Sequence, residues 1–302
     1  METTVIEPDA LERAILHTLL YSDLFDYPLT PAEAAHYLIG QSGTPDEVCA
    51  CLARSNWLAD RVIRLNGYLA LRGREALIAR RLDRATASDE LWRRARRFVR
   101  VLRVFPFVRM IAITGSLAMK NSAAHDDIDV LIVTAPDRVW LTRALAIVLV
   151  YAGKLCGDIL CPNYVISERV LTLERRTLFV AHEFAQMVPL YGLAVYDRMC
   201  AENQWIQRVL PNAAQPFWSQ PEEALGSIGR SLKRVLEKVL SGRLGNTLEN
   251  WEMRRKIRKF QPRLGQPDGD ALLDRDHVKG HFEDYGGPVM RLYAERLGQF
   301  ET

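Results

Sequence analysis

Two aspartates separated by a single residue carry the strongest chemical signal in this chain. Asp127 and Asp129 stand at the start of IDVLIVT (128–134), an apolar run that predicts a buried strand. Successive side chains of a strand alternate between its faces, so both carboxylates should project to the same side, about 6–7 Å apart. Carboxylates this close resist ionisation unless a cation lies between them. Mg²⁺, with Mn²⁺ as the alternative, prefers such hard oxygen ligands and keeps positions for water and substrate phosphates.

A Gly-Ser turn lies about ten residues before the aspartates, at the end of another apolar run. Gly115 lets a phosphate approach the backbone because it has no Cβ. Ser116 should begin a short helix, whose free N–H groups attract an anion. Lys120, one turn later, could add positive charge on the same side. Either feature alone is typical of a tight turn or a solvated strand end, but together they predict a nucleoside triphosphate, with ATP favoured, bound with Mg²⁺.

The segment from Ile113 to Thr134 resembles the signature of the nucleotidyltransferase superfamily, which includes DNA polymerase beta and the aminoglycoside nucleotidyltransferases. That signature is a hydrophobic residue, Gly-Ser, a spacer of about ten residues, and Asp-hydrophobic-Asp-hydrophobic. The match here is Gly115-Ser116 and DIDV (127–130), with Thr114 where the family has an apolar residue. The tract YSDLFDYPLT (21–30) also resembles uncharacterised bacterial nucleotidyltransferase-like proteins that have an N-terminal winged helix.

The resemblance implies a metal-dependent transfer of a nucleoside monophosphate from a triphosphate to an acceptor hydroxyl, with release of pyrophosphate. Gly115 and Ser116 would hold the β- and γ-phosphates, and Asp127 and Asp129 would bind Mg²⁺. The acceptor could be a small molecule, a protein or an RNA end.

Active members of the superfamily usually add a third carboxylate from a later strand, which binds a second metal or deprotonates the acceptor. The residue aligned with it here is Asn163 in CPNYVIS (161–167). An amide oxygen can bind a metal, but an amide cannot act as a general base. Asp158 and Glu168, on either side of this strand, are the alternative bases.

A second cluster of polar residues lies in AHEFAQ (181–186). His182 and Gln186 are one helical turn apart and could line a pocket. Adjacent His and Glu residues on a helix, here His182 and Glu183, are more often partly exposed neighbours than catalytic groups.

Residues 1–73 are expected to form a winged helix-turn-helix domain. Helical periodicity over 9–22 is followed by two capping boxes, TPAE (30–33) and TPDE (44–47). An alternating stretch with Asn66-Gly67 at its centre then predicts a hairpin. Three helices followed by a hairpin is the order of a winged helix.

The rest of the chain divides into three predicted parts, so the expected fold class is α+β. These are a basic helical connector (74–107), a polymerase beta-like nucleotidyltransferase core (108–190) and an α-helical C-terminal domain (191–302). Within the core we expect strands over 108–114, 128–134 and 159–167, and a buried crossover helix starting near Asp137. Further helices are expected over 172–188, 200–210, 221–241, 246–260 and 285–299, with a loop over 261–280.

Composition is that of a globular chain without a membrane span. With 302 residues and 48% hydrophobic content the chain can form more than one core, and a net charge of +3 demands no polyanionic partner. Five cysteines without a C-x-x-C pair fit a reducing compartment. The longest apolar run, ALAIVLVYAG (144–153), has about half the length of a bilayer span. We therefore expect a cytoplasmic protein with no membrane partner.

Two other functions fit parts of the sequence. The first is a DNA-binding regulator that uses residues 1–73. Its recognition helix would be TPDEVCACLARS (44–55), which holds only Arg54 as a base and begins with two acids, so DNA binding is not favoured. The second is a catalytically silent scaffold that binds nucleotide, which the asparagine at 163 supports. The arginines of LWRRARRFVRVLR (91–103) could follow nucleic-acid phosphates, although a solvated outer helix face is the favoured explanation.

Overall fold

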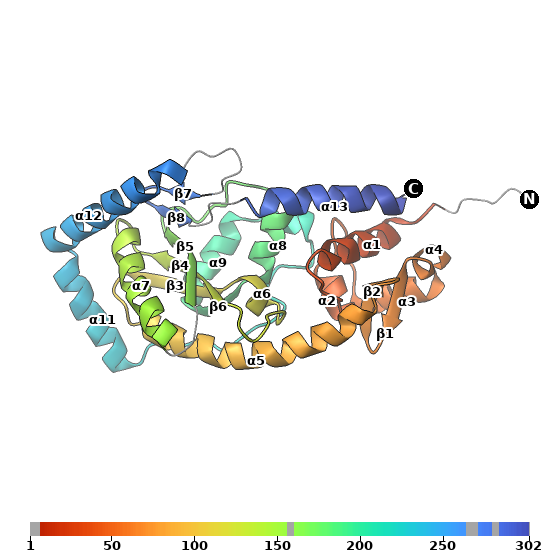
Figure 1. Ribbon diagram of the computed structural model, residues 1–302, viewed down its shortest axis with the longest axis horizontal. Coiled ribbons are helices and arrows are strands. Elements are labelled where there is room, and N and C mark those ends of the chain that lie inside the picture. Colours follow the sequence, from red (N-terminus) through yellow and green to blue (C-terminus); the bar gives the residue numbers. More distant parts are fainter. Residues whose placement is uncertain (1–6, 156–159, 264–270, 280–283, 302) are drawn as a thin grey trace, which may run out of the picture.

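A mixed β-sheet lies at the centre of the molecule in a computed structural model that describes residues 7–155, 160–263, 271–279 and 284–301 (Figure 1). Among these residues the sheet has the strand order β6-β3-β4-β5-β8-β7. β3 (Val108–Ile113) pairs antiparallel with β4 (Ile128–Thr134), which pairs parallel with β5 (Leu160–Ser167). Helices pack on this sheet, so the predicted mixed α+β class is confirmed.

The alternation of β4 decides where its aspartate points. One face of the strand packs under α5 (Ala76–Leu102) and α7 (Val139–Leu155), with Ile128, Val130 and Ile132 buried there. Leu131 and Val133 are buried on the other face, in the cluster that includes α8 (Leu178–Gln186) and α9 (Leu193–Glu202). Asp129 shares the second face because side chains alternate along a strand. α7 is the predicted crossover helix between the two parallel strands.

The first part of the chain forms helices followed by a two-stranded hairpin. Its elements are α1 (Ala10–Asp23), α2 (Pro31–His36), α3 (Pro45–Arg54), α4 (Asn56–Ala59), β1 (Val62–Leu65) and β2 (Tyr68–Leu71). Thr30 and Thr44 cap α2 and α3, and each closes the predicted box with its glutamate. Asn66 and Gly67 both have positive φ, as the tight turn of this hairpin requires. The sequence did not predict α4.

A buried polar joint connects this N-terminal part to the turn before β4. Arg81 of α5 is 3% exposed. Its guanidinium donates to the Tyr27 hydroxyl (2.7 Å), to Glu33 Oε1 (3.0 Å) and to the Lys120 carbonyl (3.0 Å). The Tyr27 hydroxyl also lies 2.7 Å from the Met119 carbonyl oxygen. These contacts fix the N-terminal part against the central sheet.

The basic connector is one continuous helix, α5, which runs along one side of the molecule (Figure 1). Part of its arginine face is used within the chain. Arg96 and Arg100 bond to Glu223 at 3.1 and 3.0 Å. Burial alone would raise the pKa of Glu223, but Arg100 and the neighbouring guanidinium groups outweigh it and lower that pKa. These arginines are therefore not all available to a nucleic-acid backbone.

The C-terminal half is less purely helical than expected. Its remaining elements are β6 (Val188–Tyr191), α10 (Ile206–Val209), α11 (Ser227–Leu240), α12 (Arg243–Phe260), η1 (Gln261–Arg263), β7 (Leu272–Leu273), β8 (His277–Lys279) and α13 (Gly286–Glu301). The loop expected over 261–280 contains β7 and β8, and β8 pairs antiparallel with β5. Strands this short are too brief to show an alternation of apolar and polar residues in the sequence. They form because the open edge of the sheet at β5 offers backbone hydrogen-bond partners. The helix expected over 172–188 begins at Leu178, after the cap of Thr177.

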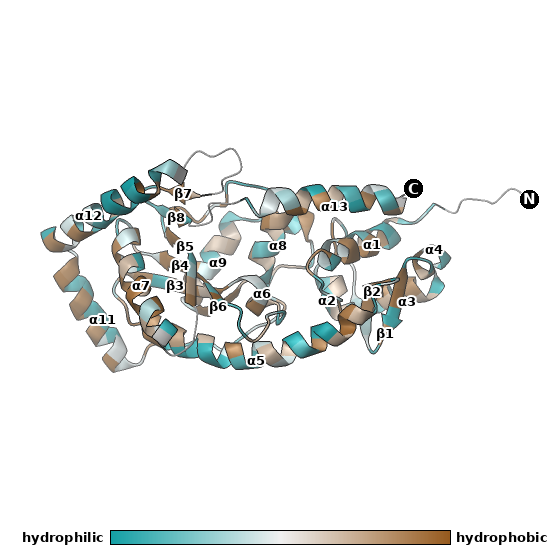
Figure 2. Cartoon of the chain, viewed as in Figure 1, coloured by the Kyte–Doolittle hydropathy of each residue, from teal (hydrophilic) through white to brown (hydrophobic). Residues whose placement is uncertain are grey.

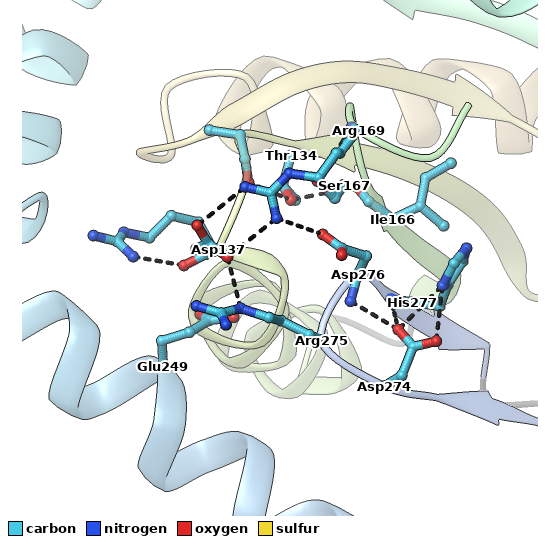
Figure 3. A network of polar contacts seen from close by, with 12 residues as sticks. Thr134, Asp137, Ile166, Ser167, Arg169, Glu249, Asp274, Arg275, Asp276 and His277 are labelled. Carbon is cyan, nitrogen blue, oxygen red and sulfur yellow. Dashed lines mark hydrogen bonds and ion pairs between the residues drawn. The ribbon is translucent and has the colours of Figure 1, made fainter. Parts of the chain in front are cut away.

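A network of ion pairs holds the β7–β8 hairpin to the turn that follows β4 (Figure 3). Asp137 accepts from Arg275 at 2.7 Å and from Arg169 at 3.2 Å, and Arg169 also reaches Asp276 at 3.5 Å. The neighbouring guanidinium groups, Arg169 first, lower the pKa of Asp137. The network thereby fixes the position of β8. None of the helices formed by the described residues is both long and apolar enough to cross a membrane.

Candidate functional site

The two aspartates lie together at the N-terminal end of β4, as their spacing predicted. Asp127 is exposed just before the strand, and Asp129 is half-buried on it. One oxygen of each carboxylate and the Cys161 sulfur all lie within 4.8 Å of one another. The thiol is close because Cys161 pairs with Asp129 across the parallel strands. The sequence reasoning missed Cys161, although it shares a strand face with Asn163.

Asn163 holds Asp129 in place. Its amide nitrogen donates a hydrogen bond to Asp129 Oδ1, and its amide oxygen accepts from the Cys161 thiol at 2.7 Å. Asn163 is therefore at the site, where it connects Asp129 of β4 to Cys161 of β5 through hydrogen bonds. Burial, and then the charges of Asp129 and Asp127, raise the pKa of the Cys161 thiol to about 12. The thiol thus stays protonated at neutral pH and remains a donor.

The electrostatics at Asp129 favour a bound cation. Burial and then the charge of Asp127 raise its pKa to about 7, although the hydrogen bond from Asn163 lowers it. Without a cation the pair therefore carries a proton much of the time at neutral pH. A divalent ion would remove the repulsion between the carboxylates and favour their ionised forms. The two carboxylates supply the hard oxygen donors that Mg²⁺ or Mn²⁺ prefers.

Gly115 is required for a reason that the sequence did not reveal. It has a φ of +65°, and a Cβ at this position would lie 2.5 Å from Asp129 Oδ2. The missing side chain therefore makes room for the carboxylate as well as for a ligand. Ser116 is exposed in α6 (Gly115–Ala118), and its hydroxyl lies 2.8 Å from the Ser122 hydroxyl. The turn and the carboxylates thus touch one another.

Lys120 does not face this site. It has a positive φ, its ammonium group lies 3.4 Å from Asp89, and it sits 4.8 Å above the Trp218 ring. It is not among the residues lining the cavity into which the aspartates project. The left-handed backbone after α6 turns the side chain towards α5. The expectation that Lys120 adds charge beside the phosphates has no support from this geometry.

The aspartates project into a cavity of about 960 Å³. Its walls come from distant parts of the chain: Tyr21 and Phe25 from the N-terminal part, Tyr164 from β5, Phe179 from α8 and Tyr285 before α13. Aromatic rings with a few polar groups are typical of pockets for cofactors and small substrates. The volume accommodates a nucleotide together with a second small molecule.

Two cationic side chains of the described residues line the cavity, and neither was predicted as a site residue. Arg175 lies 3.3 Å from Asp284. Lys279 of β8 pairs in register with Tyr164 of β5, and its ammonium group lies 5.9 Å from the centre of that ring. The ion-pair network around Asp137 positions β8, so it also positions Lys279 (Figure 3).

Glu183 brings a further carboxyl group to the cavity. Its side chain lines the cavity and is exposed to the space within it. The cavity lies below the protein surface, and this burial raises the pKa of Glu183, whereas the charge of Lys279 lowers it. Its charge contributes to the raised pKa of Asp129, so the two groups lie within electrostatic reach. A carboxyl with a raised pKa beside a metal site is suited to taking up a proton.

The neighbouring His182 is held neutral. It is 4% exposed, stacks on Tyr21 at 4.1 Å between ring centres, and lines the same cavity. Burial, and then His36, lower its pKa to about 3. Neither of its ring nitrogens has a hydrogen-bond partner among the described residues. Both nitrogens are themselves buried, so the neutral ring forms part of the cavity wall.

Of the two alternative bases named from the sequence, Glu168 is not at the site. Glu168 pairs with Arg198 at 3.3 Å and with Arg109 at 3.9 Å, and it does not line the cavity. Asp158 lies outside the described residues. The sequence pattern around Glu183 gave only a weak indication, because its place in the same cavity as the aspartates depends on tertiary packing.

Comparison with known proteins gives no match: no family model, no curated protein and no solved structure resembles this chain. The residues and geometry of the cavity are therefore the basis on which a function can be inferred.

Proposed function

We propose that the chain is a Mg²⁺-dependent nucleotidyltransferase that moves a nucleoside monophosphate from a nucleoside triphosphate, with ATP favoured, to an acceptor hydroxyl. Mn²⁺ is the alternative ion. The observation that carries the proposal is the carboxylate pair, with Asp127 and Asp129 oxygens within 4.8 Å of each other, in contact with the Gly115 turn inside a nucleotide-sized cavity. The order β3, α6, β4, α7, β5 supports a nucleotidyltransferase core, and helices α1–α3 followed by a hairpin support a winged helix.

The residues of the cavity divide the work as follows. Asp127 and Asp129 would hold the metal, which supplies charge neutralisation for the triphosphate and the departing pyrophosphate. Asn163 keeps Asp129 in the orientation that binds the metal. Gly115 and Ser116 would contact the β- and γ-phosphates through the open turn. Lys279 would add the positive charge that Lys120 was expected to supply.

Glu183 is the general base in this proposal. The acceptor oxygen attacks the α-phosphorus, the bond from that phosphorus to the bridging oxygen breaks, and pyrophosphate leaves. The Glu183 carboxylate takes the proton of the acceptor hydroxyl, so charge and atoms balance. The raised pKa of Glu183 makes it a stronger base than an exposed glutamate. The role of the absent third carboxylate would thus be filled from α8.

A small hydroxyl compound suits the cavity better than a protein or an RNA end. Tyr21 and Phe25 of the N-terminal part and Tyr285 before α13 are part of the cavity wall. A folded polymer would have to displace these elements. Four described cysteines are free thiols, which fits the expected cytoplasmic location.

The decisive experiment measures pyrophosphate release from each nucleoside triphosphate in the presence of a metabolite extract, with Mg²⁺ or with chelator. Mass spectrometry would identify the compound that gains the nucleotide mass. Asp129→Asn should abolish release while the chain stays folded by circular dichroism, and Glu168→Gln, outside the cavity, should leave it unchanged. Unaltered turnover in Asp127→Asn and Asp129→Asn would exclude the proposal.

A silent nucleotide-binding scaffold is the second candidate, because the strand position of the third acid is Asn163 and that residue is engaged by Asp129. Calorimetric binding of a triphosphate with Mg²⁺, without any pyrophosphate release in extract, would favour it. A DNA-binding regulator is less favoured, since Arg54 of α3 pairs with Asp9 at 3.0 Å. A salt-dependent gel shift of duplex DNA would revive that function.

A further inference from the structure

Helix α11 has its apolar side on the outside of the protein. Ile228, Leu232, Val235 and Val239 follow the i, i+4, i+7, i+11 spacing of a single helical face. They are 84%, 50%, 59% and 60% exposed, respectively. Figure 2 shows this helix coloured largely as hydrophobic, at the end of the molecule away from the N-terminal part. A surface helix normally turns its apolar stripe towards the core, so this orientation needs a reason.

The inward side of α11 is attached by polar groups. Lys233 is 6% exposed, and its ammonium group donates to the Arg103 carbonyl at 3.0 Å and to the Tyr191 hydroxyl at 3.1 Å. Glu237 accepts from Arg109 at 2.7 Å and from the Phe107 amide at 2.8 Å. A rotation that buried the apolar stripe would break these buried contacts. The outward stripe is therefore fixed by the fold.

The adjoining helix α12, which contacts α11, has a second exposed apolar stripe, where Leu244, Leu248 and Trp251 repeat the same spacing and are 56%, 37% and 58% exposed. Together the seven side chains form what we call the α11–α12 apolar face. Exposed apolar surface of this extent marks a site of contact with a protein or a membrane.

The exposed charges of these two helices are all of one sign. The exposed charged side chains of the two helices are Arg230, Arg234, Lys238, Arg243, Arg254, Arg255, Arg258 and Lys259. The acids of the same helices, Glu237, Glu249 and Glu252, are buried or engaged with the protein. Among the described residues, Arg255 alone of these cations pairs with an acid.

We propose that the α11–α12 apolar face docks on an anionic lipid bilayer. Aliphatic residues and a tryptophan beside uniformly basic residues are the pattern of a helix that lies in the bilayer interface. The flanking cations complement anionic headgroups. The earlier expectation of no membrane partner was drawn from the length of apolar runs, which bears on spanning and leaves binding to the surface open.

The basic and apolar side chains also favour a lipid bilayer over two other partners, a second copy of the chain and a nucleic acid. A second copy of the chain, paired through the same face, would bring the like-charged flanks of Arg234 and Lys238 close to their own symmetry mates, which opposes association. A nucleic acid would satisfy the cations, but it would leave Ile228, Val235 and Val239 uncovered, since aliphatic chains give bases no stacking surface.

Sedimentation with vesicles tests the proposal on the full chain. One set of vesicles is pure phosphatidylcholine, and in the other about a quarter of the lipid is phosphatidylglycerol. The chain should bind only the anionic vesicles, and salt should weaken the binding. Arg234→Glu with Lys238→Glu should weaken it about 25-fold or more, because each cation near an anionic surface contributes about a fivefold factor. Ile228→Ser with Val235→Ser should abolish it.

Matched controls come from α5, which is also basic and exposed. Leu82→Ser and Arg97→Glu change exposed residues outside the α11–α12 apolar face and should bind vesicles as the unchanged chain does. Circular dichroism would show that all variants are folded. Equal binding to both kinds of vesicle, or loss in the α5 controls, would overturn the proposal. If the chain bound no vesicles but formed a dimer in light scattering, and Ile228→Ser made it monomeric, self-association would replace the proposal. If the chain bound no vesicles but bound RNA in a salt-dependent way, a nucleic acid would replace it.

Discussion

The contact between Gly115 and Asp129 can be tested by adding a single methyl group. In Gly115→Ala the new Cβ would lie 2.5 Å from Asp129 Oδ2, so the carboxylate must retreat by about 0.9 Å to reach ordinary contact at 3.4 Å. A displacement of about 1 Å at a reacting centre costs on the order of a hundredfold in rate. We therefore expect pyrophosphate release to fall about a hundredfold and Mn²⁺ binding to weaken.

The backbone effect of this substitution can be measured separately. A non-glycine residue at positive φ costs about 1–2 kcal/mol, whatever surrounds it. Gly73 has a φ of +82° and nothing within 4 Å of the position of a Cβ, so Gly73→Ala carries the backbone cost alone. Both variants should melt roughly 2–6 °C below the unchanged chain. Only Gly115→Ala should lose metal binding.

The assay pairs calorimetric melting in chelator with titration of Mn²⁺, which reads metal binding without relying on turnover. Pyrophosphate release then gives the effect on chemistry. If Gly73→Ala and Gly115→Ala bound Mn²⁺ and turned over alike, the contact with Asp129 would have no role and the assignment of the carboxylate site would fail.

Three further outcomes are expected. The metal-free chain should lose up to a few kcal/mol of stability as pH rises from about 4 to about 7. The reason is that the raised pKa of Asp129 makes the folded state bind more protons than the unfolded state in that pH range. Asp129→Asn should remove this pH dependence in melting curves recorded in chelator. Glu183→Gln should reduce turnover about a hundredfold or more and leave triphosphate binding by calorimetry intact; equal losses in both would make Glu183 a binding group. Asp137→Asn should lower the free energy of unfolding at neutral pH by about 0.5–1 kcal/mol, since the ion pairs of Asp137 are partly exposed. Because the pKa of Asp137 is lowered, this stabilisation is present above the unfolded pKa near 4 and disappears as pH falls below the folded pKa. A stability difference that persisted at strongly acid pH would point to another cause.

Local patterns predicted the central strands and the position of the aspartates. The apolar runs of β3 and β4 are buried on both faces, and the turn between them contains Gly-Ser, so each element could be read from its own residues. The predicted capping boxes of α2 and α3 are confirmed for the same reason. Information of this kind lies within a few residues along the chain.

The rest of the site depends on contacts between distant segments. Glu183 and Lys279 reach the cavity only because α8 packs under the sheet and β8 adds to the open edge of β5. Cys161 lies beside Asp129 through strand register. The direction of Lys120 follows from its positive φ and from Asp89 on α5. No spacing rule along the sequence encodes these relations.

The buried joint at Arg81 has a consequence for how this chain can be divided. Its guanidinium ties Tyr27 and Glu33 to the carbonyl of Lys120, within a few residues of the glycine turn. Removing the partners of a buried charge costs about 3–5 kcal/mol. A cut near residue 73 would leave Arg81 with an uncompensated charge in the interior and remove one wall of the cavity. Residue 73 is thus not a point at which the chain can be divided without loss. The N-terminal part contributes residues to the cavity, and a shortened chain would lack them.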